Sequence, residues 1–230
     1  MTPPETIRPE AIQAMIFDMD GVIINGMPFH ARAWEETFRS VGLTITPEEV
    51  YEREGESGTA AVGHFLRERG VEASLERIRE LIRQKEERFK AIAQVEVFAG
   101  VPEFLDALLQ RGQRLALVTG TARQELDISL PLDIQKKFEI IITGDQVERG
   151  KPHPEPYLRA LAALELAAHQ AVVVENAPLG VRSAKAAGLA VLAVGTSLGC
   201  DRLQEAERCF PDLQALARYV LAWLPGERKN

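Results

Sequence analysis

Two aspartates, Asp18 and Asp20, follow directly after the short apolar run Ala14–Phe17. Two carboxylates that are held close together raise each other's pKa, and a bound divalent cation relieves the repulsion. Mg²⁺ prefers hard oxygen ligands of this kind and keeps several of its waters. A carboxylate is also able to attack phosphorus and form an acyl-phosphate. The two acids alone fit an ordinary solvated loop equally well, so the pattern needs support from elsewhere in the chain.

Polar groups with complementary chemistry follow later apolar runs. Thr119 and Gly120 end the second run, and a hydroxyl beside free backbone N–H groups suits phosphate oxygens. Lys151 precedes a proline, which makes it a rigidly placed positive charge. Glu175 and Asn176 end a further run. Each residue alone fits a turn, a surface position or a helix start, but their order along the chain indicates one site for phosphate and a metal.

The elements that must position these residues alternate between short apolar runs and helical stretches. The runs are continuously apolar, as is typical of strands buried on both faces. Strands that alternate with helices predict a parallel sheet, and such sheets bind ligands at the carboxyl ends of their strands. The predicted strands are 14–17, 114–119, 138–143, 171–175 and 189–194, and the predicted helices of this part are 101–111, 154–166, 179–187 and 213–224.

Residues 27–94 interrupt this alternation and contain only predicted helices. The last of them carries mixed charges at helical spacing, which is typical of a solvated face. We therefore expect an α/β fold with a Rossmann-like parallel sheet core, formed by residues 1–26 and 95–230, and an inserted α-helical cap domain at residues 27–94. The predicted cap helices are 31–41, 47–53, 59–69 and 75–92.

The composition excludes several classes of protein. The chain has 230 residues, of which 46% are hydrophobic and 27% charged, so it is neither disordered nor a disulfide scaffold. Its 34 acidic and 27 basic side chains give a formal net charge of −7, which argues against a nucleic-acid partner. When acidic side chains hold a Mg²⁺ ion, the ion compensates their charge, and with Lys151 beside it the local field at a phosphate can be positive. The net charge therefore does not exclude a phosphorylated substrate.

The sequence also predicts where the protein resides. No apolar run approaches the roughly 18 residues of a membrane span, and the polar N-terminus looks like neither a signal peptide nor a transit peptide. Cys200 and Cys209 lack both CxxC spacing and a neighbouring His, so we expect two reduced thiols. These features predict a cytoplasmic protein, without a membrane partner, that acts as a monomer.

Four motifs in this order resemble those of the haloacid dehalogenase superfamily of phosphohydrolases. The resemblance covers nearly the whole chain. Within the superfamily, the chain resembles more specifically the branch with a helical cap inserted after the first motif. That branch includes β-phosphoglucomutase and many small-molecule phosphatases. The motifs are FDMDGVI (Phe17–Ile23), VTG (Val118–Gly120), GKPHPEPY (Gly150–Tyr157) and VVENAPLG (Val173–Gly180).

The resemblance implies a role for each motif residue and implies Mg²⁺ as the cofactor. Asp18 is then the nucleophile that forms an aspartyl-phosphate, and Asp20 is the general acid and later the base. Thr119 and the Gly120 amide hold phosphate oxygens, while Lys151 neutralises the nucleophile and the phosphate. The implied metal ligands are Asp18, Asp20 through its main-chain carbonyl, Glu175 and Asn176.

The chain departs from the family pattern in the metal motif and in the cap. Asn176 stands where most relatives carry Asp, so the site loses a charge. Glu54 lies in a cap turn that faces the active site in relatives, and it is either the missing charge or a solvated loop acid. His30 hydrogen-bonds to Asp20 or to the substrate, with Lys85 nearby, or it is only a helix-capping residue.

The leading hypothesis is a Mg²⁺-dependent phosphohydrolase that acts on a small phosphorylated compound through an aspartyl-phosphate. Sugar phosphates and inorganic pyrophosphate are the candidate substrates; the segment MPFHARAW with ENAPLG is similar to a bacterial branch with pyrophosphatase activity. The alternative is a phosphomutase of the β-phosphoglucomutase type, although the cap turn EGESGTA lacks the Arg of that enzyme. A non-catalytic phosphate-binding module is a third reading, which the intact pair Asp18 and Asp20 opposes.

Overall fold

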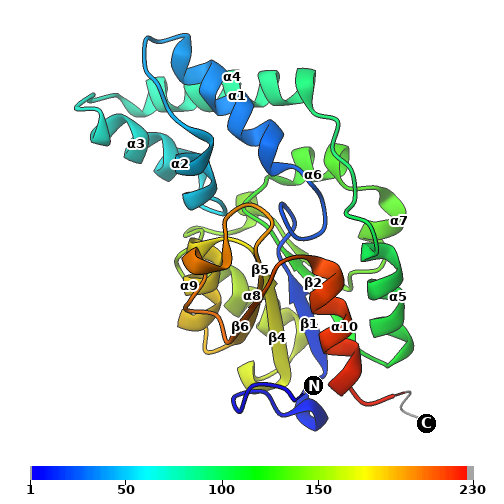
Figure 1. Cartoon of the computed structure of the whole chain (residues 1–230). Helices are drawn as coiled ribbons and strands as arrows, with labels where there is room; N and C mark the ends of the chain where they lie inside the picture. Colours follow the sequence, from blue (N-terminus) through cyan, green and yellow to red (C-terminus); the bar gives the residue numbers. More distant parts are fainter. Residues whose placement is uncertain (1, 227–230) are drawn as a thin grey trace.

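A sheet of six parallel strands forms the centre of the core in the computed structural model, which describes residues 2–226 (Figure 1). The strand order is β3-β2-β1-β4-β5-β6, so the strand that leads into Asp18 lies in the middle. This confirms the predicted Rossmann-like α/β fold with a parallel sheet. The strands are β1 (Ala14–Phe17), β2 (Arg114–Val118), β3 (Ile140–Ile142), β4 (Ala171–Glu175), β5 (Ala190–Val194) and β6 (Arg208–Phe210).

Helices cover both faces of the sheet and explain why the strands are apolar throughout. Met15 and Phe17 of β1 point into one buried cluster, and Ala14 and Ile16 point into the other. Helices α5 (Val101–Gln110) and α10 (Leu213–Trp223) cover the first face, and α8 (Glu155–Leu164) and α9 (Pro178–Ala186) cover the second. None of the helices in the described part of the chain combines the length and the apolar character needed to cross a membrane.

Three short elements of the core were not predicted. Strand β6 has three residues at the edge of the sheet, and its Arg208 is exposed, so it lacks a strand-like pattern. Helices α6 (Arg123–Ser129) and α7 (Leu132–Gln135) follow β2, and the exposed side chains of Ile128 and Leu132 obscure their periodicity. Helix α6 matters most for function, because it borders the predicted site.

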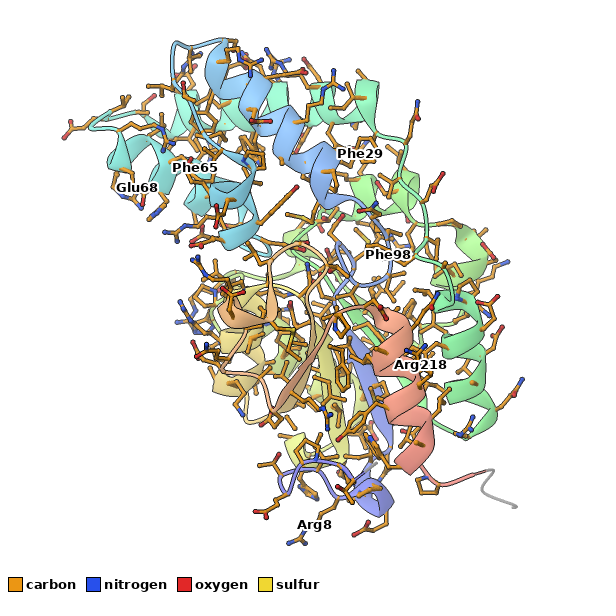
Figure 2. All side chains as sticks on the ribbon, viewed as in Figure 1. Arg8, Phe29, Phe65, Glu68, Phe98 and Arg218 are labelled. Atoms are coloured by element: carbon orange, nitrogen blue, oxygen red, sulfur yellow. A yellow bond between two sulfur atoms is a disulfide. The ribbon has the colours of Figure 1, made fainter. Side chains whose placement is uncertain are left out.

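Four helices form the cap, which lies beyond the carboxyl ends of the strands (Figure 1). They pack around a hydrophobic cluster of their own that includes Phe38 and Phe65, and Figure 2 labels Phe65. The side chains of Thr46, Ser57 and Ser74 cap the second, third and fourth of these helices. The cap helices are α1 (Met27–Arg39), α2 (Pro47–Glu52), α3 (Gly58–Glu68) and α4 (Leu75–Ile92).

The chain crosses between core and cap twice, and the two crossings are hydrogen-bonded to each other. Ile24 and Val97 form an antiparallel bridge, and the Asn25 amide donates to the Glu96 carbonyl at 2.9 Å. This paired connection lies next to the loop that carries Asp18 and Asp20. It therefore ties the position of the cap to the position of the loop that carries these two aspartates. The domain boundaries at residues 27 and 94 stay an interpretation.

The prediction of two reduced thiols is wrong. Cys200 and Cys209 form a disulfide, with their Cα atoms 5.7 Å apart, and the described residues contain no free cysteine. The loop after β5 turns back over the end of β6, where the Gly195 amide donates to the Phe210 carbonyl at 2.8 Å. This fold of the loop brings the two cysteines together, and their spacing of nine residues does not reveal it.

Candidate active site

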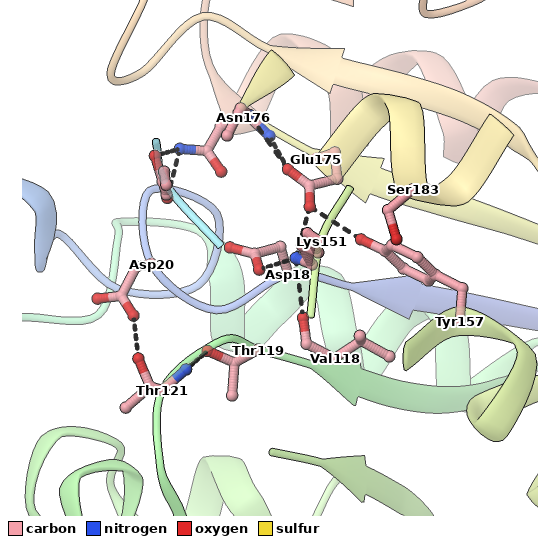
Figure 3. A network of polar contacts seen from close by, with 12 residues as sticks. Asp18, Asp20, Val118, Thr119, Thr121, Lys151, Tyr157, Glu175, Asn176 and Ser183 are labelled. Carbon is pink, nitrogen blue, oxygen red and sulfur yellow. Dashed lines mark hydrogen bonds and ion pairs between the residues drawn. The ribbon is translucent and has the colours of Figure 1, made fainter. Parts of the chain in front are cut away.

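Lys151 lies between two buried carboxylates at the floor of the site (Figure 3). Its Nζ atom donates to Oδ1 of Asp18 at 2.5 Å and to Oε1 of Glu175 at 2.6 Å. It also donates to the Val118 carbonyl at 3.3 Å. These groups stand at the ends of β1, β2 and β4, which are neighbours in the sheet. The parallel sheet therefore brings together residues that are far apart in the sequence.

Four hydrogen bonds use both carboxylate oxygens of Glu175. Oε1 accepts from Lys151 and from the Tyr157 hydroxyl, the latter at 2.8 Å. Oε2 accepts from the backbone amides of Asn176 and Ala177 at 2.8 and 3.1 Å. The structure thus places Glu175 as a support for Lys151 and for the backbone of Asn176. Its direct contact with a metal stays a prediction.

Asp20 is oriented from both the core and the cap. The Thr121 hydroxyl donates to Oδ2 of Asp20 at 3.1 Å, and Nε2 of His30 lies 3.3 Å from Oδ1. The His30 ring stacks on Phe89, with centroids 4.1 Å apart. Burial raises the pKa of Asp20, but His30, the hydrogen bond from Thr121 and the charge of Lys85 outweigh it, so the pKa is lowered from its ordinary value. These neighbours therefore favour the ionised form of Asp20.

Glu54 reaches from the cap turn into the floor of the site. Both of its carboxylate oxygens accept from Nδ2 of Asn176, at 3.0 and 2.9 Å. The Ser197 hydroxyl oxygen accepts from the same Nδ2 at 2.9 Å. Because these contacts fix the amide nitrogen, Oδ1 of Asn176 points elsewhere; it is buried and has no hydrogen-bond partner among the described residues. Of the two readings of Glu54, the structure places it at the site.

Acidic side chains are buried close together at this floor, which disfavours their ionised forms. Burial raises the pKa of Asp18 to about 8, although Lys151 opposes the shift, and Glu175 adds to it. Burial and the neighbouring Asp18 likewise hold the pKa of Glu54 well above its ordinary value. The Lys151 ammonium pairs with Asp18 and Glu175, and Glu54 lies beside this pair without a cation of its own among the described residues.

The oxygens present fit a hard divalent cation. Within residues 2–226, no three His, Cys, Asp or Glu side chains converge as a ready-made metal cluster. The available donors are instead the Asp18 carboxylate, the unpartnered Oδ1 of Asn176 and the loop that carries Asp20. Few protein oxygens with room for water are what Mg²⁺ prefers, and Zn²⁺ would favour nitrogen or sulfur. The residues therefore fit Mg²⁺.

The loops that follow β2 and β3 each require a glycine. A Cβ on Gly120 would lie 2.9 Å from the carbonyl oxygen of Gly55, in the cap turn. A Cβ on Gly144 would lie 2.1 Å from the carbonyl oxygen of Gly120. The Thr119 hydroxyl accepts from the Thr121 amide at 3.0 Å, which fixes the turn between them. Thr119 and Gly120 thus stand at the floor, directly under the cap turn.

A cavity of about 310 Å³ separates the cap from the core above this floor. Its cap wall includes apolar side chains, among them Trp34 and Phe65. Lys85 from α4 and Glu125 from α6 also line it, with Nζ of Lys85 3.3 Å from Oε1 of Glu125. Nδ1 of His30 lies 3.9 Å from the same Glu125 oxygen. Cap and core therefore meet in one charged network beside Asp20.

Every residue that the sequence predicted for the site lies at this cavity or directly behind its floor. The sequence reasoning missed the roles of Thr121, Glu125, Tyr157 and Ser197. Tyr157 ends the motif GKPHPEPY, and Thr121 directly follows the motif VTG, so both could have been found from the sequence. Glu125 and Ser197 carry no local signal, because only packing brings them to the site. The predicted catalytic and metal-binding roles of the other residues stay predictions.

Comparisons with known proteins identify the family of the chain. Residues 15–194 match the family described as haloacid dehalogenase-like hydrolase. Protein CbbY of Rhodobacter capsulatus is 32% identical over 225 residues, covering 93% of this chain and 99% of that protein. Hexitol phosphatase A of Escherichia coli K12 is 32% identical over 213 residues, covering 89% and 93%.

Solved structures of a similar protein contain phosphate compounds. CbbY of Rhodobacter sphaeroides in complex with phosphate is 26% identical, with a TM-score of 0.74 over 89% of this chain and 96% of that one. A variant of the same protein in complex with xylulose 1,5-bisphosphate has a TM-score of 0.72 at 26% identity, over 87% and 94% of the two chains. The fold of this chain is thus shared with a protein whose structures hold phosphate and a bisphosphate.

Proposed function

Because the chain belongs to the haloacid dehalogenase-like hydrolase family and is a phosphatase of that family, we propose that it hydrolyses a small phosphate monoester in a Mg²⁺-dependent reaction. The reaction proceeds through an aspartyl-phosphate on Asp18. Sugar or polyol phosphates are the leading substrates, and inorganic pyrophosphate is the second candidate.

The concentration of buried acidic groups carries the proposal. Asp18, Glu54 and Glu175 are each less than a tenth exposed, and Asp18 and Glu175 pair with the Lys151 ammonium, whereas Glu54 accepts only from the neutral amide of Asn176. Uncompensated buried charge is costly, and one divalent cation would balance it. Asp18 and Oδ1 of Asn176 would hold this cation, together with the main-chain carbonyl of Asp20. Glu54 would replace, from the cap, the charge that Asn176 lacks.

The residues of the chain divide the chemistry into two steps. In the first, a carboxylate oxygen of Asp18 attacks phosphorus, the bond from phosphorus to the leaving oxygen breaks, and Asp20 gives that oxygen a proton. In the second, Asp20 takes a proton from water, whose oxygen attacks phosphorus and releases phosphate from Asp18. Thr119, the Gly120 amide and Lys151 hold the phosphate oxygens throughout.

In the metal-free site Asp18 has a higher pKa than Asp20, whereas the reaction needs an ionised Asp18 and a protonated Asp20. The pKa of Asp18 is raised to about 8, and the pKa of Asp20 is lowered. A bound Mg²⁺ supplies positive charge that favours ionised Asp18. A phosphate dianion beside Asp20 raises its pKa by like-charge repulsion, so that it enters the first step with a proton. The site is thus poised only when both ligands are present.

The cavity favours a leaving group of sugar size. Its volume of about 310 Å³ and its apolar cap wall exceed what inorganic pyrophosphate requires. The similarity to hexitol phosphatase A supports the same choice. A phosphomutase must hold a second phosphate at the far end of the cavity, and the arginine next to the cap turn, Arg53, is already paired with Glu56. A non-catalytic module gives no reason for Asp18, Asp20 and Lys151 to meet.

Release of inorganic phosphate from a substrate panel tests the proposal. The panel contains hexose and hexitol monophosphates, phosphoglycolate and pyrophosphate, each with Mg²⁺ and with EDTA. We expect Mg²⁺-dependent release, fastest from a sugar or polyol monophosphate. No release from any compound, together with conversion of glucose 1-phosphate to glucose 6-phosphate, would establish the mutase instead.

A further inference from the structure

Lys85 and Glu125 form a buried ion pair in the wall of the cavity. Lys85 comes from the cap helix α4 and Glu125 from the core helix α6, and their side chains are 8% and 11% exposed. Nζ of Lys85 also lies over the rings of Phe89 and Trp34, 4.9 and 5.9 Å from the centroids. The ammonium is therefore held in place on several sides and balanced by the carboxylate.

The other cation of the wall is also paired. Of the lysines and arginines in the described part of the chain, Arg53 and Lys85 line the cavity. Nη1 of Arg53 lies 3.7 Å from Oε1 of Glu56, and its Nη2 contacts the His64 ring. The second oxygen of Glu56 is buried and has no hydrogen-bond partner among residues 2–226. The wall thus offers paired charges and a spare acceptor, but no unpaired cation.

We propose that Glu125 is a specificity-determining residue that selects a monophosphate with an uncharged, hydroxyl-bearing leaving group against a compound with a second phosphate. The inference rests on the proposed phosphatase function. Glu125 neutralises Lys85, as Glu56 neutralises Arg53, so a second phosphate that enters the cavity finds no unpaired cation. Its repulsion by the carboxylates lowers the affinity for a bisphosphate. A sugar or polyol hydroxyl, in contrast, donates to Glu125 or Glu56 and accepts from Lys85.

The residues of this pocket determine this selectivity, and the fold as such does not. The similar CbbY chain from Rhodobacter sphaeroides has been solved as a variant with xylulose 1,5-bisphosphate. A fold of this kind therefore accommodates a second phosphate when its wall allows one. Specificity obtained by a repulsive group is a difference between two affinities, so it is measured as a ratio for two substrates.

The test compares glucose 6-phosphate with glucose 1,6-bisphosphate, which differ by one phosphate. The ratio of kcat/KM for the monophosphate to kcat/KM for the bisphosphate is measured for the wild type and for Glu125→Gln. We expect the wild type to prefer the monophosphate and the variant to lower the ratio by about tenfold or more, mainly through KM. Asp127→Asn, an exposed charge removal on the same helix, is the matched control and leaves the ratio unchanged.

Lys85→Gln provides a second variant with the opposite sign. It leaves the carboxylate of Glu125 without its cation, so the ratio should rise above that of the wild type. A ratio that stays constant in both variants, or a wild type that prefers the bisphosphate, would overturn the inference while the phosphatase function stands. Absence of phosphate release by folded wild-type protein from both compounds and from every member of the substrate panel above would overturn the proposed function itself, and the inference with it.

Discussion

The amide nitrogen of Asn176 lies 2.9 Å from a carboxylate oxygen of Glu54, although the two residues are 122 positions apart in the sequence. One comes from the end of β4 and the other from the cap turn. The contact leaves Oδ1 of Asn176 without a partner among the described residues. The contact thus joins the cap turn to the floor of the site, next to the oxygen that we propose as a metal ligand.

Glu54→Gln should weaken Mg²⁺ binding by about tenfold to a hundredfold, because it removes a charge beside the proposed metal site. The measurement is the rise in melting temperature of the protein with increasing Mg²⁺, which needs no turnover. Glu87→Gln, on the exposed face of α4, is the matched control. An unchanged Mg²⁺ titration for Glu54→Gln would show that this carboxylate serves only the Asn176 contact.

Asp18→Asn should lower phosphate release by at least about 10³-fold, because an amide does not form the acyl-phosphate. The variant also loses the ion pair with Lys151, so its folding is checked by its melting curve. Asp127→Asn should keep the wild-type rate. Turnover by folded Asp18→Asn within tenfold of the wild type would refute the role of Asp18 as nucleophile.

Gly55→Ala should raise KM and lower kcat, because it prevents full closure of the cap. Gly55 has a positive φ of 80°, and a Cβ there would lie 2.6 Å from Cδ of Lys151. Gly70→Ala is the matched control, since Gly70 has a φ of 68° and open space around its Cβ position. Both variants place an alanine in the left-handed region of backbone conformation, but only the Cβ of Gly55→Ala contacts a residue of the site. Equal kinetic effects would attribute the loss to strain alone.

Tyr157→Phe should destabilise the fold by about 1–3 kcal/mol and also reduce the phosphatase rate. The Tyr157 hydroxyl donates to Glu175 in a fully buried position, so its loss disturbs the support of Lys151. Tyr219→Phe removes a comparable hydroxyl that donates to the Thr2 carbonyl at 2.7 Å, far from the cavity lining. Chemical denaturation and kinetics are measured for both, and a rate loss in both variants would count against a specific role for Tyr157.

The stability of the metal-free protein should fall as pH rises from about 4 to about 8. The pKa of Asp18 is raised from 3.8 to about 8 in the fold, so the folded state holds a proton there that the unfolded state has lost. This contribution is fully present below pH 3.8 and is lost as pH rises through about 8. In EDTA, the free energy of unfolding should therefore decline more steeply for the wild type than for Asp18→Asn. Parallel curves would contradict the raised pKa.

The sequence by itself determined the sheet, the cap and the ends of the strands that carry chemistry. Strands buried on both faces need continuously apolar runs, so β1, β2, β4 and β5 are visible without a structure. Asp18, Thr119 and Glu175 adjoin those runs or end them, and local position was enough to find them. The three-residue edge strand β6 and the short helices α6 and α7 were missed, because their exposed residues interrupt the pattern.

Only the tertiary structure decided which groups meet across the cavity. Glu125 reaches Lys85 over 40 positions, and Ser197 reaches Asn176 over 21, through packing that no local spacing encodes. The pairing of Cys200 with Cys209 depends in the same way on how the loop after β5 turns back over β6. Local patterns report the burial of a residue in its own element, whereas contacts between elements depend on how helices and loops pack in space. The residues of the floor could therefore be found from the sequence, and the contacts of the wall could not.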